Sequence, residues 1–295
     1  MIEGVGIVLG HAVSAIVLGW LYFRWVRMPR PPLGVLNRSD VLVMMLATIV
    51  VPYLYLALPR WLVGALLGAV TFGILFVTVE PLPIPRWGSW LGAVALTSAD
   101  LATWLRWGPT DVSFVMVNNL VLTAAAVSVA NLWAQSGMKA RDAALLGGML
   151  AVYDAVFTAG LSVMNDLLDR LAGLPFAPQV VWPVGDGQWV GLGLGDLLLM
   201  TVFPLVLRKA FGRRAGLAAL TTSLAVITTL LGLALLGVLR HDFPLMVVLG
   251  PLMALQYGYW TRTRRSERRT WEYLRELGAG GRPSRDQAAV VGEVT

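Results

Sequence analysis

Two acidic side chains stand inside long apolar stretches, where a carboxylate is unusual. They belong to two short motifs, Tyr153-Asp154 and Gly193-Leu194-Gly195-Asp196. An ionised carboxylate at membrane depth is strongly destabilising, so chains retain one mainly where it pairs, titrates or catalyses. Two such acids in consecutive apolar runs predict one shared site. A carboxylate pair that holds one proton between its members is the working state of an aspartyl protease.

The glycines before Asp196 agree with this interpretation. Because glycine has no Cβ, Gly193 and Gly195 would let another backbone or a substrate come close to the acid. Glycine also weakens a helix, so we expect the helix to be least stable just before Asp196.

The composition places these acids in a membrane protein. Of 295 residues, 57% are hydrophobic and only 14% are charged, whereas soluble domains carry roughly 25% charged residues. The net charge of +6 comes from basic residues between and beyond the apolar runs, which is a topology signal and not a nucleic-acid surface. Cysteine is absent and only two histidines occur, so disulfides, thiolate nucleophiles and His- or Cys-ligated metals are excluded.

The apolar runs predict an all-α bundle of about nine transmembrane helices. We expect spans at about residues 2–26, 41–58, 61–79, 90–107, 112–134, 140–163, 188–207, 215–239 and 244–260. A short Pro- and Gly-rich loop is expected between the sixth and seventh spans. In this division residues 1–261 form the catalytic bundle and residues 262–295 form a basic cytoplasmic tail, whose arginines would anchor the topology and, as a weaker addition, bind anionic lipid.

Basic residues predict the orientation. Connections after odd-numbered spans hold most of the arginines and lysines, including Arg24, Arg27, Lys139 and Arg208. The positive-inside rule then places the amino terminus outside and the carboxyl terminus in the cytoplasm. Counted along these spans at 1.5 Å per residue, Asp154 and Asp196 fall at similar depths, nearer the outer face.

At these residues the sequence resembles the presenilin and signal peptide peptidase superfamily of intramembrane aspartyl proteases. That family carries Tyr-Asp in its sixth helix, Gly-x-Gly-Asp in its seventh and Pro-Ala-Leu at its ninth. The first two motifs match here, each in the expected span. The third is degraded: Pro244-Leu245-Met246 is the best candidate and Pro251-Leu252-Met253 is its rival. The expected orientation resembles the signal peptide peptidase branch and is opposite to presenilin.

The resemblance implies the roles of the site residues. Asp154 and Asp196 would be the catalytic dyad, one activating a water as general base and the other polarising the scissile carbonyl as acid. Substrate-binding residues would be Tyr153, Gly193, Leu194, Gly195, Pro244, Leu245 and Met246. The substrate would be a transmembrane helix or a signal peptide remnant that unwinds locally and pairs as a strand with enzyme backbone near Pro244. No metal or other cofactor is implied.

Two other functions fit the same residues. A proton-coupled transporter could use Asp100, in the fourth span, together with Asp154 and Asp196 as relay groups. A prepilin-peptidase-like protease also uses Gly-x-Gly-Asp, but such enzymes have fewer spans and a cytoplasmic site. For Asp100 a hydrogen bond within the bundle is the simpler interpretation. The expected partners are the lipid bilayer and a membrane-spanning substrate, with no nucleic acid, and the expected location is a prokaryotic plasma membrane.

Overall fold

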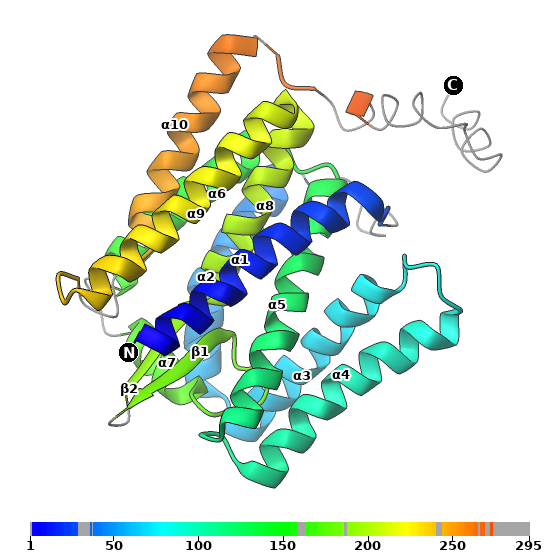
Figure 1. Cartoon of the computed structure of the whole chain (residues 1–295), viewed down its shortest axis with the longest axis vertical. Helices are drawn as coiled ribbons and strands as arrows, with labels where there is room; N and C mark the ends of the chain where they lie inside the picture. The colour runs from blue at the N-terminus through cyan, green and yellow to red at the C-terminus, as the bar shows by residue number, and fades with distance from the viewer. Residues whose placement is uncertain are drawn as a thin grey trace.

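The computed structural model describes residues 2–28, 36, 38–158, 163–185, 188–239, 244–264, 266–268 and 272–273. These residues form a bundle of helices with one small sheet (Figure 1). The helices of the first half are α1 (Ile2–Trp25), α2 (Arg38–Ala57), α3 (Arg60–Val79), α4 (Arg86–Trp107) and α5 (Val112–Gln135). The second half contains α6 (Ala140–Tyr153), a π-helical turn (Asp154–Thr158), α7 (Val163–Leu171), β1 (Gln179–Gly185), β2 (Gln188–Gly193), α8 (Leu194–Phe211), α9 (Arg213–Leu235) and α10 (Met246–Arg264).

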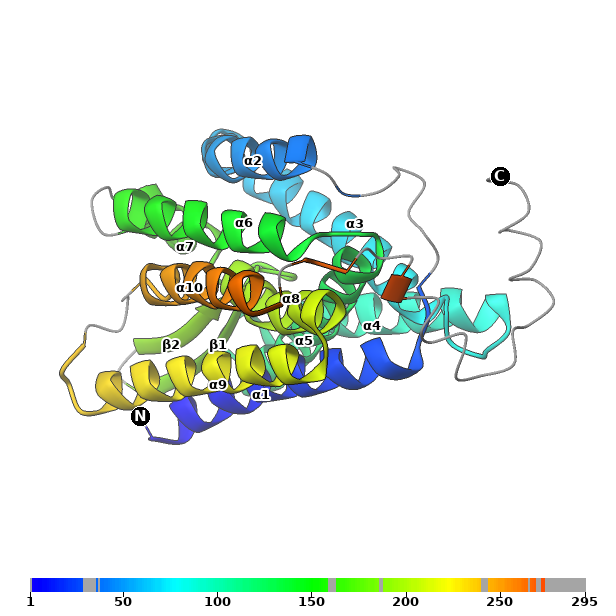
Figure 2. The same ribbon diagram turned by 90° about the horizontal axis from the view of Figure 1, so that it is seen from above.

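Helix α8 lies in the middle of the bundle. It packs against α1, α5, α6 and α9, and the view from above places it between α6 and α10 on one side and α1 and α9 on the other (Figure 2). Its side chains are buried along most of the stretch from Leu197 to Phe211. Helices α3 and α4 pack against each other and against α5, far from α10 (Figure 1). The helix that carries Asp196 is therefore surrounded by protein.

Five helices are long and apolar enough to cross a membrane, namely α1, α2, α3, α5 and α9. This confirms a helical membrane protein, whereas nine crossings and the orientation stay predictions. The sixth predicted span changes from α- to π-helix at Asp154, and its residues 159–162 lie outside the described part of the chain. The seventh begins at Leu194 and not at Gln188, because residues 188–193 form a strand.

The antiparallel hairpin β1–β2 replaces the loop expected between these spans. Side chains alternate along both strands, so that Val180, Trp182, Val190 and Leu192 are buried on one face. That face covers the start of α1, where a Cβ on Gly4 would overlap the side chain of Val184 and crowd Trp182. Period-two burial together with two glycines that disfavour a helix explains why this apolar stretch is extended.

The start of the basic tail folds back onto the bundle. The backbone N–H of Ala140, at the start of α6, donates to a carboxylate oxygen of Glu267 at 2.5 Å, and the ring of Tyr273 stacks on Phe23 with centroids 5.6 Å apart. Burial raises the pKa of Glu267, and the Ala140 N–H and the nearby charge of Lys209 act in the opposite direction. The predicted tail division at residue 262 falls inside α10, and its residues beyond 273 lie outside the described part of the chain.

Candidate active site

Asp154 stands where the sixth helix changes its winding. Helix α6 ends at Tyr153, and the π-helical turn begins with Asp154 itself. Such turns occur mostly as short interruptions of α-helices and are frequent at functional sites, because they rotate side chains out of the regular helical register. Asp154 is half-buried, and its Oδ2 accepts the backbone N–H of Met246 at 3.2 Å. The first acid is thus tied to the amino-terminal end of α10.

Asp196 lies in the first turn of α8, directly after the hairpin. Gly193 is the N-cap residue, with extended backbone and no side chain to cap the helix. An acid in the first turn interacts favourably with the positive end of the helix dipole. The side chain of Asp196 is half-buried and turns back toward Gly193, since a Cβ on Gly193 would lie 3.4 Å from Asp196 Oδ2. Helix α8 begins only two residues before Asp196, because the preceding residues form β2, so the acid lies nearer the helix start than the predicted span implied.

The two acids lie close enough for the charge of Asp154 to act on Asp196. Three contacts hold this region together: α6 packs on α8, and α10 packs on both α6 and the π-helical turn. Like charges at short range oppose each other, and this favours a state in which the pair shares one proton. A pair with one ionised and one protonated carboxyl has the chemistry of a general base beside a general acid.

Contact between α6 and α10 depends on small residues. A Cβ on Gly250 would overlap the carbonyl oxygen of Gly147 and stand 2.8 Å from the Cβ of Ala151. Met253 lies against Gly147, where an added Cβ would meet its Sδ at 2.8 Å. This close approach brings the start of α10 to Asp154. The sequence analysis did not identify Gly250, because a glycine in an apolar run does not by itself show which helix it contacts.

The rival prolines are distinguished by the fold. Pro244 precedes α10, Leu245 and Met246 are buried, and Met246 supplies the N–H that Asp154 accepts. Pro251 instead lies inside α10 and is exposed, one residue after the Gly250 contact. Of the two candidates for the third motif, Pro244-Leu245-Met246 is therefore the one beside the acids.

The remaining predicted site residues surround the pair to different degrees. Tyr153 is buried, and its ring stacks on that of Phe157 with centroids 4.5 Å apart. It also lies close enough to Asp154 to interact electrostatically with that carboxylate. Leu194 continues the line of β2, and its N–H donates to the carbonyl oxygen of Pro178 at 2.9 Å. Gly195 is exposed, and a Cβ there would have no neighbour within 4 Å. An open surface thus adjoins Asp196.

Asn119 holds the hairpin in place. Its Nδ2 donates to the carbonyl oxygen of Val181 at 2.7 Å, and its Oδ1 accepts the N–H of Val181 at 3.0 Å. The Asn119 side chain thereby forms hydrogen bonds with the outer edge of β1, as the backbone of a neighbouring strand would. The partner of Asn119 is a strand that the sequence analysis had not predicted.

Asp100 belongs to a different part of the molecule. It is fully buried in α4, where its Oδ2 accepts the N–H of Phe176 at 3.0 Å. Phe176 has a φ of 62°, a left-handed conformation that is rare for a bulky residue and needs such support. This contact agrees with the structural interpretation of Asp100. It fixes the segment that leads into β1.

Comparison of the sequence with models of protein families found no match, and comparison with characterised proteins found no similar relative. Within the described ranges, no three His, Cys, Asp or Glu side chains gather closely enough to hold a metal ion. The function must therefore be argued from the geometry around Asp154 and Asp196.

Proposed function

We propose that the chain is an intramembrane aspartyl endopeptidase of the presenilin and signal peptide peptidase type, on the signal peptide peptidase-like branch. The observation that carries this proposal is that Asp154 accepts the N–H of Met246 and also lies near enough to Asp196 for the two charges to interact. Asp154 and Asp196 belong to the two matching motifs, and Met246 belongs to the candidate for the degraded third motif. Chance motifs scattered along a chain have no physical reason to converge.

Hydrolysis follows from the pair if its members share one proton. The ionised acid removes a proton from a water held between the carboxyls, and the water oxygen attacks the scissile carbonyl while the protonated acid donates to the carbonyl oxygen. Collapse of the resulting diol breaks the C–N bond, and a proton passes to the leaving nitrogen. The hydrogen bond from Met246 to Asp154 Oδ2 at 3.2 Å would hold that carboxyl in one orientation throughout.

The hairpin offers a place for an unwound substrate. Because both backbone groups of Val181 face Asn119, Val181 and Gly191 form a pair without mutual hydrogen bonds, and the N–H and C=O of Gly191 point away from β1. Gly191 is exposed, and β2 runs directly into Gly193 and Asp196. A substrate strand added at this edge would carry a peptide bond past the acids. Here the proposal differs from our expectation, which placed strand pairing near Pro244.

Membrane placement belongs to the same proposal. Nine crossings require α4, the α6–π segment, α8 and α10 to cross together with the five apolar helices. The surroundings of α8 make this reasonable, since a helix enclosed by other helices need not be apolar along its whole length. The amino terminus would lie outside, the carboxyl terminus in the cytoplasm, and the host membrane would be a prokaryotic plasma membrane.

A cleavage assay tests the proposal. A reporter peptide with one transmembrane helix is incubated in liposomes with the wild type and with the variants Asp154→Asn, Asp196→Asn and Asp169→Asn. Asp169 is an exposed acid of α7 and serves as the matched control. We expect the first two variants to lose about 10²- to 10⁴-fold of the rate, the usual contribution of a general acid or base. The control should cleave normally.

If Asp154→Asn or Asp196→Asn cleaves as fast as the wild type, the assignment of these two acids as the catalytic dyad is wrong. An aspartyl-protease inhibitor that mimics the tetrahedral diol gives an independent readout, because a transition-state analogue binds far more tightly than substrate to the intact site. Such a compound should block the wild type and should bind poorly to both site variants.

A further inference from the structure

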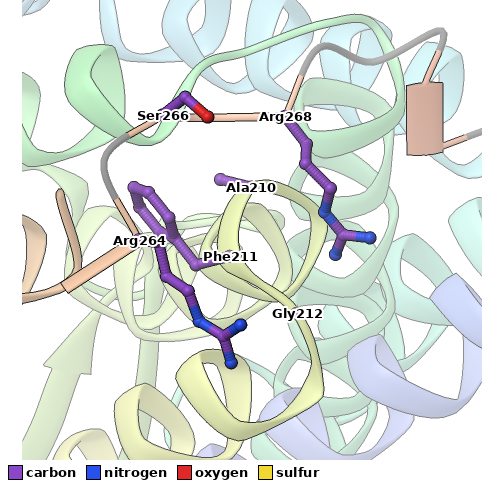
Figure 3. A pocket seen from close by; sticks show the side chains of 6 residues that line it. All are labelled: Ala210, Phe211, Gly212, Arg264, Ser266 and Arg268. Carbon is purple, nitrogen blue, oxygen red and sulfur yellow. The ribbon is translucent and has the colours of Figure 1, made fainter.

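A cavity of about 340 Å³ lies where α8 ends and α9 begins, away from the two acids. Its walls come from the turn between these helices and from the end of α10 with the segment that follows it (Figure 3). The lining residues are Ala210, Phe211, Gly212, Arg264, Ser266 and Arg268. The proposed proteolytic function gives this cavity no role.

The wall supplied by the tail is held by hydrogen bonds. The backbone N–H of Arg268 donates to the carbonyl oxygen of Ala210 at 3.1 Å, and its Nη2 donates to that of Arg208 at 3.3 Å. These bonds satisfy carbonyl groups at the end of α8. The next residue back, Glu267, accepts the N–H of Ala140, so its carboxylate is directed to α6. The cavity is thus part of the packed structure.

Positive charge surrounds this cavity from several elements. The guanidinium groups of Arg264 and Arg268 stand on two sides of the turn at Gly212 (Figure 3). Gly212 has a φ of 97°, is the N-cap of α9, and offers no side chain to the free N–H groups of the 23-residue helix. Arg213 and Arg214, which begin α9, are both exposed. Arginine forks and a helix amino terminus are the two groups that most readily bind phosphate.

An exposed apolar residue lies near the start of α9, the helix whose N-cap Gly212 lines the cavity. Leu217, one turn along α9 from Arg213, is 39% exposed, and α9 is one of the helices apolar enough to cross a membrane. A ligand with a phosphate in the cavity and hydrocarbon along α9 would match both surfaces. An anionic phospholipid has this construction, and basic clusters at the ends of membrane helices bind such lipids electrostatically.

We propose that this cavity binds the phosphate of an anionic phospholipid headgroup. The guanidinium of Arg264 contacts the phosphate oxygens, and Arg268 adds positive charge from the other side of the Gly212 turn. The hydroxyl of Ser266 donates to one phosphate oxygen, and the first N–H groups of α9 face the same anion. The bound lipid joins the start of α9 to the tail, and through the tail to the start of α6 and the end of α8. Lipid binding should therefore raise the thermal stability of the bundle.

The test uses the full-length chain in a neutral detergent. Native mass spectrometry counts lipid retained after addition of phosphatidylglycerol or phosphatidylcholine, and a thermal melt is recorded with each lipid. The variant is Arg264→Gln, which removes one guanidinium of the cavity. Arg262→Gln is the matched control, because Arg262 is an exposed arginine of the same helix that does not line the cavity. The melt of each variant without lipid verifies folding.

We expect the wild type and Arg262→Gln to retain phosphatidylglycerol over phosphatidylcholine and to melt at a higher temperature with it. Arg264→Gln should bind phosphatidylglycerol about fivefold to tenfold more weakly, as expected for one lost arginine at a membrane surface. Equal retention by Arg264→Gln and Arg262→Gln would overturn the site. Stabilisation by inorganic phosphate or glycerol 3-phosphate equal to that by the lipid would overturn the lipid as the ligand.

Discussion

The two glycines before Asp196 are not required by packing. A Cβ on Gly193 would make only an ordinary contact with Asp196 Oδ2 at 3.4 Å, and a Cβ on Gly195 would enter open space. Gly193 also has φ and ψ of −62° and 143°, which any residue can adopt. If neither the fold nor the backbone demands glycine here, the reason should be the approach of another molecule. This supports a substrate surface beside the acid.

Replacement of Gly195 by alanine separates folding from activity. Because Gly195 is in the first turn of α8 and its Cβ would be unhindered, Gly195→Ala should leave stability unchanged or raise it by up to about 1 kcal/mol through helix propensity. Cleavage of the reporter helix should fall at the same time, since the new methyl group projects where substrate would pass. A thermal melt and the cleavage assay measure the two effects. If Gly195→Ala cleaves the reporter as fast as the wild type does, Gly195 has no role in substrate binding.

At the scale of elements, the site depends on how closely α6 and α10 approach. Gly147, Ala151 and Gly250 form the contact, and it sets the height at which α10 begins beside Asp154. In lipid, where apolar surface gains nothing from leaving water, such small residues allow the close packing that holds helices together. The dyad is therefore supported by a helix contact in which neither acid takes part.

Gly250→Ala should disrupt this contact. Its Cβ would overlap the backbone of Gly147, and backbone cannot rotate away as a side chain can. We expect a loss of about 1–3 kcal/mol, the usual penalty of overpacking, together with a lower cleavage rate. Gly148→Ala is the control on the facing helix, because a Cβ there would meet no atom within 4 Å. Equal melting temperatures for the two variants would contradict this account.

Asn119→Ala should release β1 from the bundle. The substitution leaves the N–H and the C=O of Val181 without their present hydrogen-bond partner. Each buried polar group left without a hydrogen bond lowers the free energy of unfolding by about 1–3 kcal/mol. Hydrogen exchange at Val181 should become faster. Asn118→Ala is the comparison, because Asn118 is buried but its Oδ1 has no hydrogen-bond partner in the described structure. Similar exchange at Val181 in both variants would rule out this role.

At the scale of the molecule, the two ends of the bundle differ. The turn after α4 and the hairpin lie at one end, and the connection from α5 to α6, the α8–α9 turn and the folded tail lie at the other (Figure 1). Helix α5 joins the two ends with 24 residues, or about 36 Å at 1.5 Å per residue, enough to cross a bilayer core. Most of the arginines named above lie at the second end. By the positive-inside rule, this favours a cytoplasmic location for that end.

Labelling of single cysteines tests this orientation. The natural chain has no cysteine, so each introduced thiol reports alone. Thr110→Cys and Lys139→Cys place exposed thiols just before and just after α5. A membrane-impermeant maleimide added to intact cells should label the first and leave the second unlabelled until the cells are opened. The reverse pattern would invert the proposed topology.

Much of this protein was determined by the sequence alone. Long apolar runs required helices, because only internally bonded backbone is stable in lipid, and a helix formed in each of the nine predicted spans, although five are apolar enough to cross by themselves. The two acidic motifs were recognisable because charge is rare in such runs. Their mutual approach was predicted from chain connectivity, and it stays a prediction, although the charge of Asp154 reaches Asp196.

Other features were decided only by the tertiary structure. An apolar stretch such as residues 188–193 can be a helix or a strand, and contacts with α1 and Asn119 of α5 made the hairpin the stable choice. The same is true of Pro244 and Pro251, whose sequences are alike but whose distances from Asp154 depend on the Gly147–Gly250 contact. The fold of the tail onto α6 and α8 likewise rests on partners more than 50 residues away. Local composition cannot specify such pairings, because their energy comes from residues distant in the chain.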